Sequence, residues 1–198
     1  MENKGTADFF LERRILPIGK ITLESIAQMT VAVAKLNMQS AEGITLLIDS
    51  PGGSLESSMH FYDFVKCCRT PFTAVVMEAC HSAAINILVA CGKRLSLPHA
   101  KFLLHATRVT QEFSEDEYSA EVIKNTAHRL KTVHGWSVAL QAKETRLKEE
   151  KIQELMHQGH RHKKLLTPEE MKKLGYIHEI VPSFPIFRES PEAHGSST

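Results

Sequence analysis

The feature that most constrains this chain is a short apolar run that ends in glycines. Residues 44–48 read Ile-Thr-Leu-Leu-Ile, and residues 49–54 continue as Asp-Ser-Pro-Gly-Gly-Ser. A continuous apolar run of this length lacks the alternation of a half-exposed strand, so it is typical of a strand buried on both faces. The proline and the glycines predict a turn directly after it. Such a strand belongs in the interior of a parallel sheet.

The same order of buried strand, turn and helix recurs along the chain. Residues 72–77 form a second apolar run, which leads through the small residues of 78–84 into an apolar helix at about 85–91. Alternating strands and helices are typical of a parallel α/β fold. The other expected elements of this part are a strand within 9–19, a helix capped by Thr22, a helix from Leu55 to about Val65, and short strands at 94–97 and 102–104.

The region from about residue 114 to 156 is long, charged and helix-prone. We expect a long helix or a helical pair that projects from the core, with Gly135 as its weakest point. Thr167 then caps a short helix, because a proline and two glutamates follow it, and a strand is expected at 176–181. The predicted segments are a flexible stretch at 1–8, a single domain at 9–182 and a disordered tail at 183–198.

Composition limits the kinds of partner and site. The chain has 198 residues, and 24 Lys and Arg against 23 Asp and Glu give a net charge of +1, so we expect neither nucleic acid nor a membrane as a partner. The N-terminal residues lack the apolar run of an export signal, which predicts a cytoplasmic protein. The four cysteines show no CxxC spacing, so we expect no disulfide and no metal. The sequence predicts no cofactor.

Four residues that could build a hydrolase site follow the ends of the expected strands. Ser82 lies in the small-residue turn, His105 closes the strand at 102–104, and Gly53 and Ala83 lie in the two turns. A serine hydroxyl needs a base to take its proton, and imidazole is the usual base at neutral pH. The backbone N–H groups of Gly53 and Ala83 can hold the negative charge that develops on an attacked carbonyl. Taken alone, Ser82 would be a helix cap and His105 a buried histidine.

Four stretches, in this order, resemble the Clp protease proteolytic-subunit (ClpP) family. IDSPGGSLESSMHFYDFV is similar to its Pro-Gly-Gly loop and helix, EACHSAAINILVACGKR to its nucleophile turn, LSLPHAKFLLH to its Leu-Pro…His stretch, and LTPEEMKKLGYIHEIV to its closing helix and strand. The resemblance covers about residues 9–182. It implies a ClpP/crotonase-like α/β spiral of ββα units with parallel sheets and a projecting long helix. By this resemblance Ser82 is the nucleophile, His105 the general base, and the N–H groups of Gly53 and Ala83 the oxyanion hole.

The sequence departs from the family at the third member of the triad. The family has an aspartate a few residues before the closing helix, whereas this chain reads Gly-His-Arg-His-Lys-Lys at 159–164. His162 or Lys163 takes that position, depending on where a small insertion is placed. A cation there would lower the pKa of His105, while His162 could accept a hydrogen bond from it, so His162 is the candidate third member. Glu78 and Ala84 each stand where the family usually has glycine, and Thr107–Thr110 replaces the pair of glycines that usually follows the histidine.

Three functions remain open on the sequence. The first is a serine peptidase subunit that cleaves unfolded polypeptides; the resemblance implies homo-oligomeric heptameric rings that stack, and a separate AAA+ unfoldase. This chain has no P-loop motif of its own. The second is a catalytically weak or inactive ring or regulatory subunit, which the missing carboxylate favours. The third is a crotonase-like acyl-CoA enzyme.

Two other features suggest sites less strongly. His157, His160 and His162 have no acidic or thiolate neighbour, so they indicate a cation-repelling loop rather than a metal site. Cys80 lies two residues before Ser82, but nothing near it marks a thiolate of lowered pKa.

Overall fold

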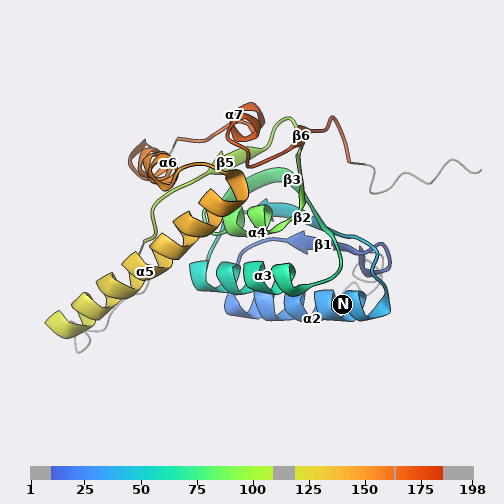
Figure 1. Cartoon of the computed structure of the whole chain (residues 1–198), viewed down its shortest axis with the longest axis horizontal. Helices are drawn as coiled ribbons and strands as arrows, with labels where there is room; N and C mark the ends of the chain where they lie inside the picture. The colour runs from blue at the N-terminus through green and yellow to red at the C-terminus, as the bar shows by residue number, and fades with distance from the viewer. Residues whose placement is uncertain (1–9, 109–118, 163, 185–198) are drawn as a thin grey trace, which may run out of the picture.

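The computed structural model describes residues 10–108, 119–162 and 164–184, and of His162 it describes only the backbone. Figure 1 shows a sheet with helices packed around it. The pairings between the strands of the described residues are all parallel, and the strand order is β1-β2-β3-β4-β6, with β5 paired to β3. This confirms the parallel α/β prediction. An isolated antiparallel bridge joins Phe102 to Leu166. The strands are β1 (Ile15–Ile18), β2 (Ile44–Ser50), β3 (Phe72–His81), β4 (Lys93–Ser96), β5 (Lys101–Leu103) and β6 (Glu179–Ile180).

Strand β3 organises the sheet because it has different partners along its length. Its first half, Thr73–Val76, pairs with β4, and its last residues, Ala79–His81, pair with β5. The strand is therefore longer than the apolar run at 72–77 predicts. Its polar and small final residues extend past β4 and bring the end of β3 beside the end of β5. This junction is where the candidate site forms.

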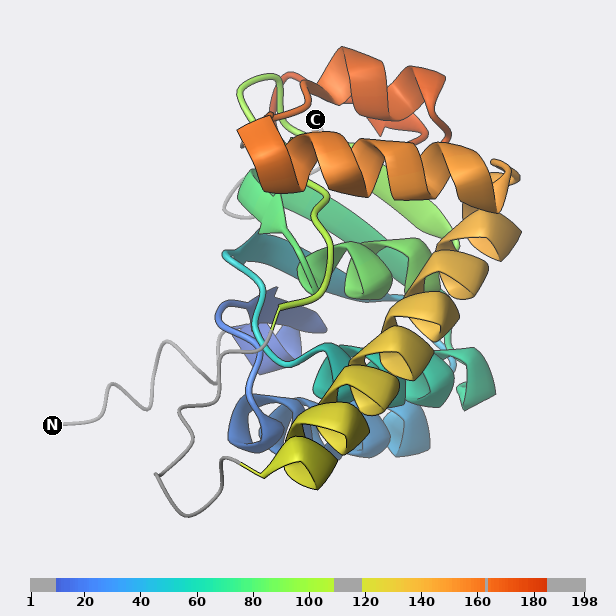
Figure 2. The ribbon, with the colours of Figure 1, turned by 90° about the vertical axis from the view of Figure 1, so that its left-hand side faces the viewer.

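Helices follow one another along one face of the sheet. Figure 2 shows α2, α3 and α4 in succession, with α5 crossing them diagonally. Thr22 and Thr167 cap α2 and α7 as predicted, each accepting a hydrogen bond from the backbone N–H three residues later. The helices are α2 (Leu23–Gln39), α3 (Leu55–Cys67), α4 (Ala84–Ala90), α5 (Ala120–Thr145), α6 (Glu149–His162) and α7 (Pro168–Lys173).

The long charged region forms a helical pair, α5 and α6, which is one of the two forms that the sequence predicts. Its break lies at Arg146, which caps α5 in the left-handed conformation with φ of 64°. Gly135, the predicted weak point, lies inside the continuous helix α5 with open space where a side chain would begin. The buried residues of α5 begin only at Val133, and Ile123 near its start is 53% exposed. The first turns of α5 therefore project from the core.

The core occupies both faces of the sheet. The larger cluster lies between the sheet and its helices and includes the fully buried Phe61, Phe102 and Tyr176. A smaller cluster forms on the opposite face from one side chain of each of β1 to β4: Ile15, Leu47, Val75 and Leu95. Burial on both sides explains why β2 and β3 read as unbroken apolar runs.

Several sequence predictions differ from the structure in detail. The segment at 157–162 is the end of helix α6 rather than a loop, and the strand predicted at 176–181 is only Glu179–Ile180. Strand β5 ends at Leu103, so His105 lies two residues beyond it. All four cysteines are free thiols; Cys80 and Cys91 are buried and Cys67 is exposed. The predicted flexible start at 1–8 and nearly all of the tail at 183–198 lie outside the described residues.

Candidate active site

Ser82 occupies a strained turn at the end of β3. Its φ is 57°, in the left-handed region that a residue with a side chain seldom adopts. The turn is held by the Ser82 N–H, which donates to the Leu103 carbonyl at 2.7 Å. A serine in a sharp turn between a strand and a helix projects its hydroxyl away from the backbone, which is the arrangement that exposed nucleophiles use.

The two glycines after β2 fit tightly against their neighbours. A Cβ at Gly52 would lie 2.6 Å from the His81 carbonyl oxygen and 2.7 Å from the Ser82 Cβ. A Cβ at Gly53, whose φ is 145°, would lie 2.0 Å from the Ile21 carbonyl oxygen. Only glycine fits at either position, so the glycine loop is pressed directly against the Ser82 turn.

The backbone N–H groups of Gly53 and Ala83 lie in these two turns. Ala83 precedes α4 as its N-cap, and neither N–H donates a hydrogen bond among the described residues. The loop that carries Gly53 is fixed from both sides: Ile21 donates to the Gly52 carbonyl and Ser54 donates to the Ile21 carbonyl, each at 2.9 Å. Two fixed donors beside Ser82 are what an oxyanion hole requires.

Among the described residues, His105 makes one hydrogen bond, and this bond determines its tautomer. Its Nδ1 lies 2.7 Å from the Ala106 carbonyl oxygen. A carbonyl oxygen only accepts hydrogen bonds, so Nδ1 carries the proton. The neutral ring therefore has a free lone pair on Nε2. This is the tautomer that a general base toward a serine hydroxyl needs.

The surroundings of His105 oppose its protonation. Burial lowers its pKa, and the nearby Arg108 and His160 lower it further, while the hydrogen bond to Ala106 acts in the opposite direction. No carboxylate of the described residues is among the groups that shift it. The lowered pKa favours the neutral imidazole, and a positive charge formed on it during attack has little to stabilise it.

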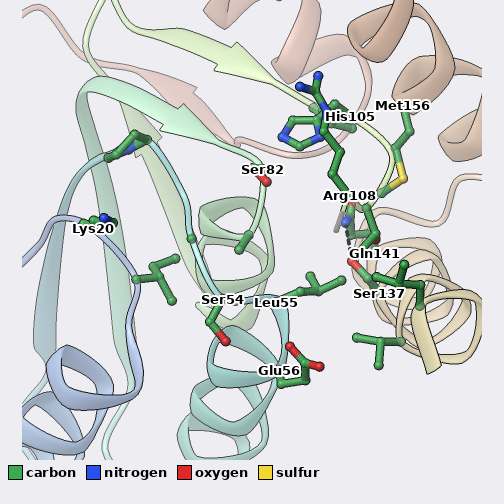
Figure 3. Close-up of a pocket in the computed structure, with 18 residues that line it drawn as sticks. Lys20, Ser54, Leu55, Glu56, Ser82, His105, Arg108, Ser137, Gln141 and Met156 are labelled. Atoms are coloured by element: carbon green, nitrogen blue, oxygen red, sulfur yellow. Dashed lines mark hydrogen bonds between the residues drawn. The ribbon is translucent and has the colours of Figure 1, made fainter. Parts of the chain in front are cut away.

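Ser82 and His105 line the same pocket, which has a volume of about 650 Å³. Figure 3 shows both side chains facing this space, with Arg108 beside the imidazole and α5 and α6 on the far side. Gly53 and Ala83 also line it. No hydrogen bond joins the Ser82 hydroxyl to His105 in the described structure. Contacts of this kind are often long in an unliganded site and shorten when substrate binds.

Helix α6 brings the histidine-rich segment next to His105. A Cβ at Gly159 would lie 1.7 Å from the Leu104 carbonyl oxygen, so the helix backbone rests on the residue before His105. His162, the candidate third member, is the last residue of α6. Its side chain and Lys163 fall outside what the structure describes, so the role of His162 stays a prediction.

The structure also places residues in the pocket that the sequence did not single out. Ser137 and Gln141 of α5 line it and belong to a buried hydrogen-bonded network with Asn86. Their spacing of four residues along a helix was the available signal, since it puts two polar side chains on the apolar face. The alternative nucleophile Cys80 is fully buried, which raises the pKa of its thiol and disfavours the thiolate.

Comparisons with known proteins agree on one family. The model of the Clp protease family matches residues 2–183. The chain is 32% identical over 178 residues to the ATP-dependent Clp protease proteolytic subunit 1 of Thermobifida fusca, a match that covers 86% of this chain and 75% of that protein. It is 28% identical over 134 residues to the chloroplastic proteolytic subunit 3 of Arabidopsis thaliana, covering 66% of this chain and 43% of that protein.

The fold has a counterpart among solved structures. A point mutant of ClpP1 from Listeria monocytogenes matches with a TM-score of 0.76 at 22% identity, covering 90% of this chain and 96% of that one. In the described part of the chain, no helix has the length and apolar character that crossing a bilayer requires. The name of the Arabidopsis relative includes a plastid location, so the compartment can differ among relatives and the cytoplasmic location stays a prediction.

Proposed function

This chain belongs to the Clp protease family, and from that premise we propose that it is a serine peptidase subunit that cleaves polypeptides through a Ser82–His105 dyad. The observation that carries the proposal is the left-handed backbone of Ser82 in a pocket shared with the free Nε2 of His105. Strain of this kind persists only where the surrounding structure enforces it, and here Gly52 and Leu103 hold the turn.

The chemistry follows from the atoms that face the pocket. Nε2 of His105 takes the proton of the Ser82 hydroxyl while the oxygen attacks the peptide carbonyl carbon. The N–H groups of Gly53 and Ala83 receive the negative charge on the carbonyl oxygen. The imidazolium then gives its proton to the leaving amine, which departs as the acyl-enzyme forms. Water, activated by the same imidazole, releases the acid product and regenerates Ser82.

The Ala106 carbonyl performs one part of the task of the missing aspartate. It holds the Nδ1 proton at 2.7 Å, so it fixes the ring orientation and the tautomer. A carbonyl dipole stabilises an imidazolium less than a carboxylate does, and Arg108 and His160 oppose the charge. We therefore expect slow turnover. Loss of a triad carboxylate costs about 10⁴-fold in rate where the correct tautomer is lost with it, so we expect a smaller loss here, where Ala106 keeps the tautomer.

Labelling of Ser82 tests the proposal. A fluorophosphonate should label wild-type protein at Ser82, and Ser82→Ala should abolish both labelling and hydrolysis of a fluorogenic peptide ester. His105→Gln should lower the rate of labelling, whereas the control His99→Gln, at an exposed position, should leave it unchanged. Absence of labelling in the wild-type protein, with the fold intact by circular dichroism, would refute the proposal.

An inactive or weakly active ring subunit is the second candidate, and the absence of a carboxylate from the groups acting on His105 favours it. We further propose, from the resemblance to the ClpP family, that the chain assembles into heptameric rings that stack and receive substrate from an AAA+ unfoldase. The names of its relatives as ATP-dependent subunits support an ATP-driven partner. Native mass spectrometry measures the assembly. If this chain alone is inactive but changes the hydrolysis rate of an active relative on mixing, it is a regulatory subunit. The matches are to Clp protease subunits, which leaves the crotonase-like alternative without support.

A further inference from the structure

Helix α4 carries the nucleophile half of the candidate site. The Ile85 N–H donates to the Ser82 carbonyl, and the Asn86 N–H donates to the Ala83 carbonyl, each at 3.1 Å. The first turn of α4 is therefore bonded directly to the nucleophile and to the residue that supplies one oxyanion donor. A shift of α4 moves both groups.

Helices α5 and α6 hold the His105 half. His134 Nδ1 of α5 lies within hydrogen-bond distance of the Thr107 hydroxyl, at 3.2 Å, two residues beyond His105. The chain continues from α5 into α6, whose Gly159 rests on Leu104, the residue before His105. The backbone that carries the imidazole is thus held from both sides by this helical pair.

The Asn86 side chain joins the two halves. Among the seven residues of α4 it alone is polar, and it is fully buried. Its Oδ1 accepts hydrogen bonds from the Ser137 hydroxyl and from Gln141 Nε2 of α5, each at 3.0 Å. Its Nδ2 donates to Ser58 Oγ of α3 at 3.1 Å. One amide therefore ties α4 to the helices on either side of it.

These hydrogen bonds specify one arrangement of α4 against α5. A hydrogen bond weakens steeply when its length or angle changes, so a buried network in which the groups are paired favours a single geometry. Both lone pairs of Asn86 Oδ1 are used by donors that lie four residues apart on α5. The Gln141 amide is fixed in turn by the Tyr176 hydroxyl, which donates to its Oε1 at 2.9 Å.

We propose that Asn86 is a positioning residue for the peptidase site, where it sets the separation between the Ser82 turn and the His105 imidazole. The inference rests on the proposed function, since it names a residue that prepares the same site. Asn86 does not line the pocket, whereas Ser137 and Gln141 lie across the pocket from Ser82 (Figure 3). It therefore acts through the helices. A displacement of about 1 Å in a catalytic group can cost about 100-fold in rate, so a small shift is sufficient.

Asn86→Leu tests this role. Leucine has as many side-chain heavy atoms as asparagine and branches at the same carbon, but it makes no hydrogen bond. We expect kcat for a fluorogenic peptide ester and the rate of Ser82 labelling by a fluorophosphonate to fall roughly 10- to 100-fold. KM should stay near its wild-type value, because the residues that line the pocket are unaltered. An unchanged kcat in the folded variant would overturn the proposal.

Asn86→Asp is the conservative variant that should rescue the rate. It keeps an oxygen where Ser137 and Gln141 donate, so the link between α4 and α5 remains. Most of kcat should return, although a buried carboxyl group lowers the melting temperature. If Asn86→Leu does not fold, Ser137→Ala removes one of the two hydrogen bonds and should lower kcat by a smaller factor. An unchanged kcat in Ser137→Ala would then count against the role of Asn86.

Thr70→Val is the matched control for stability. Thr70 is 3% exposed, and its hydroxyl donates to Asn37 Oδ1 at 2.7 Å. It precedes the start of β3, whereas Ser82 follows the end of that strand, so this buried hydrogen bond is remote from the site. The melting temperature should fall while kcat and labelling stay unchanged. An equal loss of kcat in Thr70→Val and Asn86→Leu would show that reduced stability alone slows the reaction, which overturns the proposal.

Hydrogen exchange measured by NMR separates this inference from the proposed function, because it needs no turnover. The Ile85 N–H, which bonds the Ser82 carbonyl, should exchange faster in Asn86→Leu than in Thr70→Val. If wild-type Ser82 is neither labelled nor active but this difference is found, the proposed catalysis fails and the positioning of the turn by Asn86 stands. If Ser82 is active and neither kcat nor exchange responds to Asn86→Leu, only the positioning role fails.

Discussion

Replacement of Gly159 by alanine tests how His105 is positioned. Alanine forms helices better than glycine by about 1 kcal/mol, so helix propensity alone predicts that Gly159→Ala stabilises α6. The tertiary structure predicts the opposite, because the new Cβ would lie 1.7 Å from the Leu104 carbonyl oxygen. A carbon and an oxygen in contact need about 3.3 Å, so α6 or the Leu104–His105 backbone must move by about 1.5 Å.

Both consequences of that movement can be measured. Overpacking of this kind costs about 1–3 kcal/mol, which should appear as a lower midpoint in urea unfolding followed by circular dichroism. A displacement of about 1 Å in a catalytic group can cost about 100-fold in rate, so labelling of Ser82 and peptide hydrolysis should fall by one to two orders of magnitude. The rate should fall by more than unfolding alone would cause, because most of the protein would still be folded.

Gly135→Ala is the control for this experiment. Gly135 lies inside α5 with nothing within 4 Å of an added Cβ, so the same substitution meets open space there. It should stabilise the protein by up to about 1 kcal/mol and leave labelling unchanged. If Gly159→Ala behaves like Gly135→Ala in both assays, α6 does not rest on Leu104 and our account of how His105 is held is wrong.

Three further outcomes are expected. His162→Asp places a carboxylate at the predicted position of the third triad member. It should raise kcat by at least about 10-fold and move the acid limb of the pH–rate profile to higher pH. Unchanged kinetics would place residue 162 away from His105. Arg108→Gln removes a charge that lowers the pKa of His105, so the acid limb of kcat/KM, which follows protonation of the base as pH falls, should also move to higher pH. An unmoved limb would mean that Arg108 does not act on the imidazole. In Gly53→Ala, the new Cβ would lie 2.0 Å from the Ile21 carbonyl oxygen. The substitution should displace the glycine loop and reduce the rate of hydrolysis by about 100-fold. Near wild-type rates would exclude the Gly53 N–H from the oxyanion hole.

The sequence by itself determined the fold class and named the candidate residues of the site. Runs such as 44–48 and 72–77 predict buried strands because burial on both faces requires apolar residues at every position. Thr22 and Thr167 predict helix starts because capping is a local interaction. Ser82, His105 and the glycine loop could be named because each closely follows a buried strand, and parallel strands place such residues at one edge of the sheet.

The tertiary structure decided what long-range contacts control. The extension of β3 along β5 and the contact of Gly159 with Leu104 both depend on how distant segments meet in space, and no local pattern encodes them. The end of α5 at Arg146 rather than at Gly135 has the same cause, because packing overrides an intrinsic preference of about 1 kcal/mol. The buried hydrogen-bonded network of Ser137 and Gln141 likewise forms only where α5 meets α4, since Asn86 of α4 completes it.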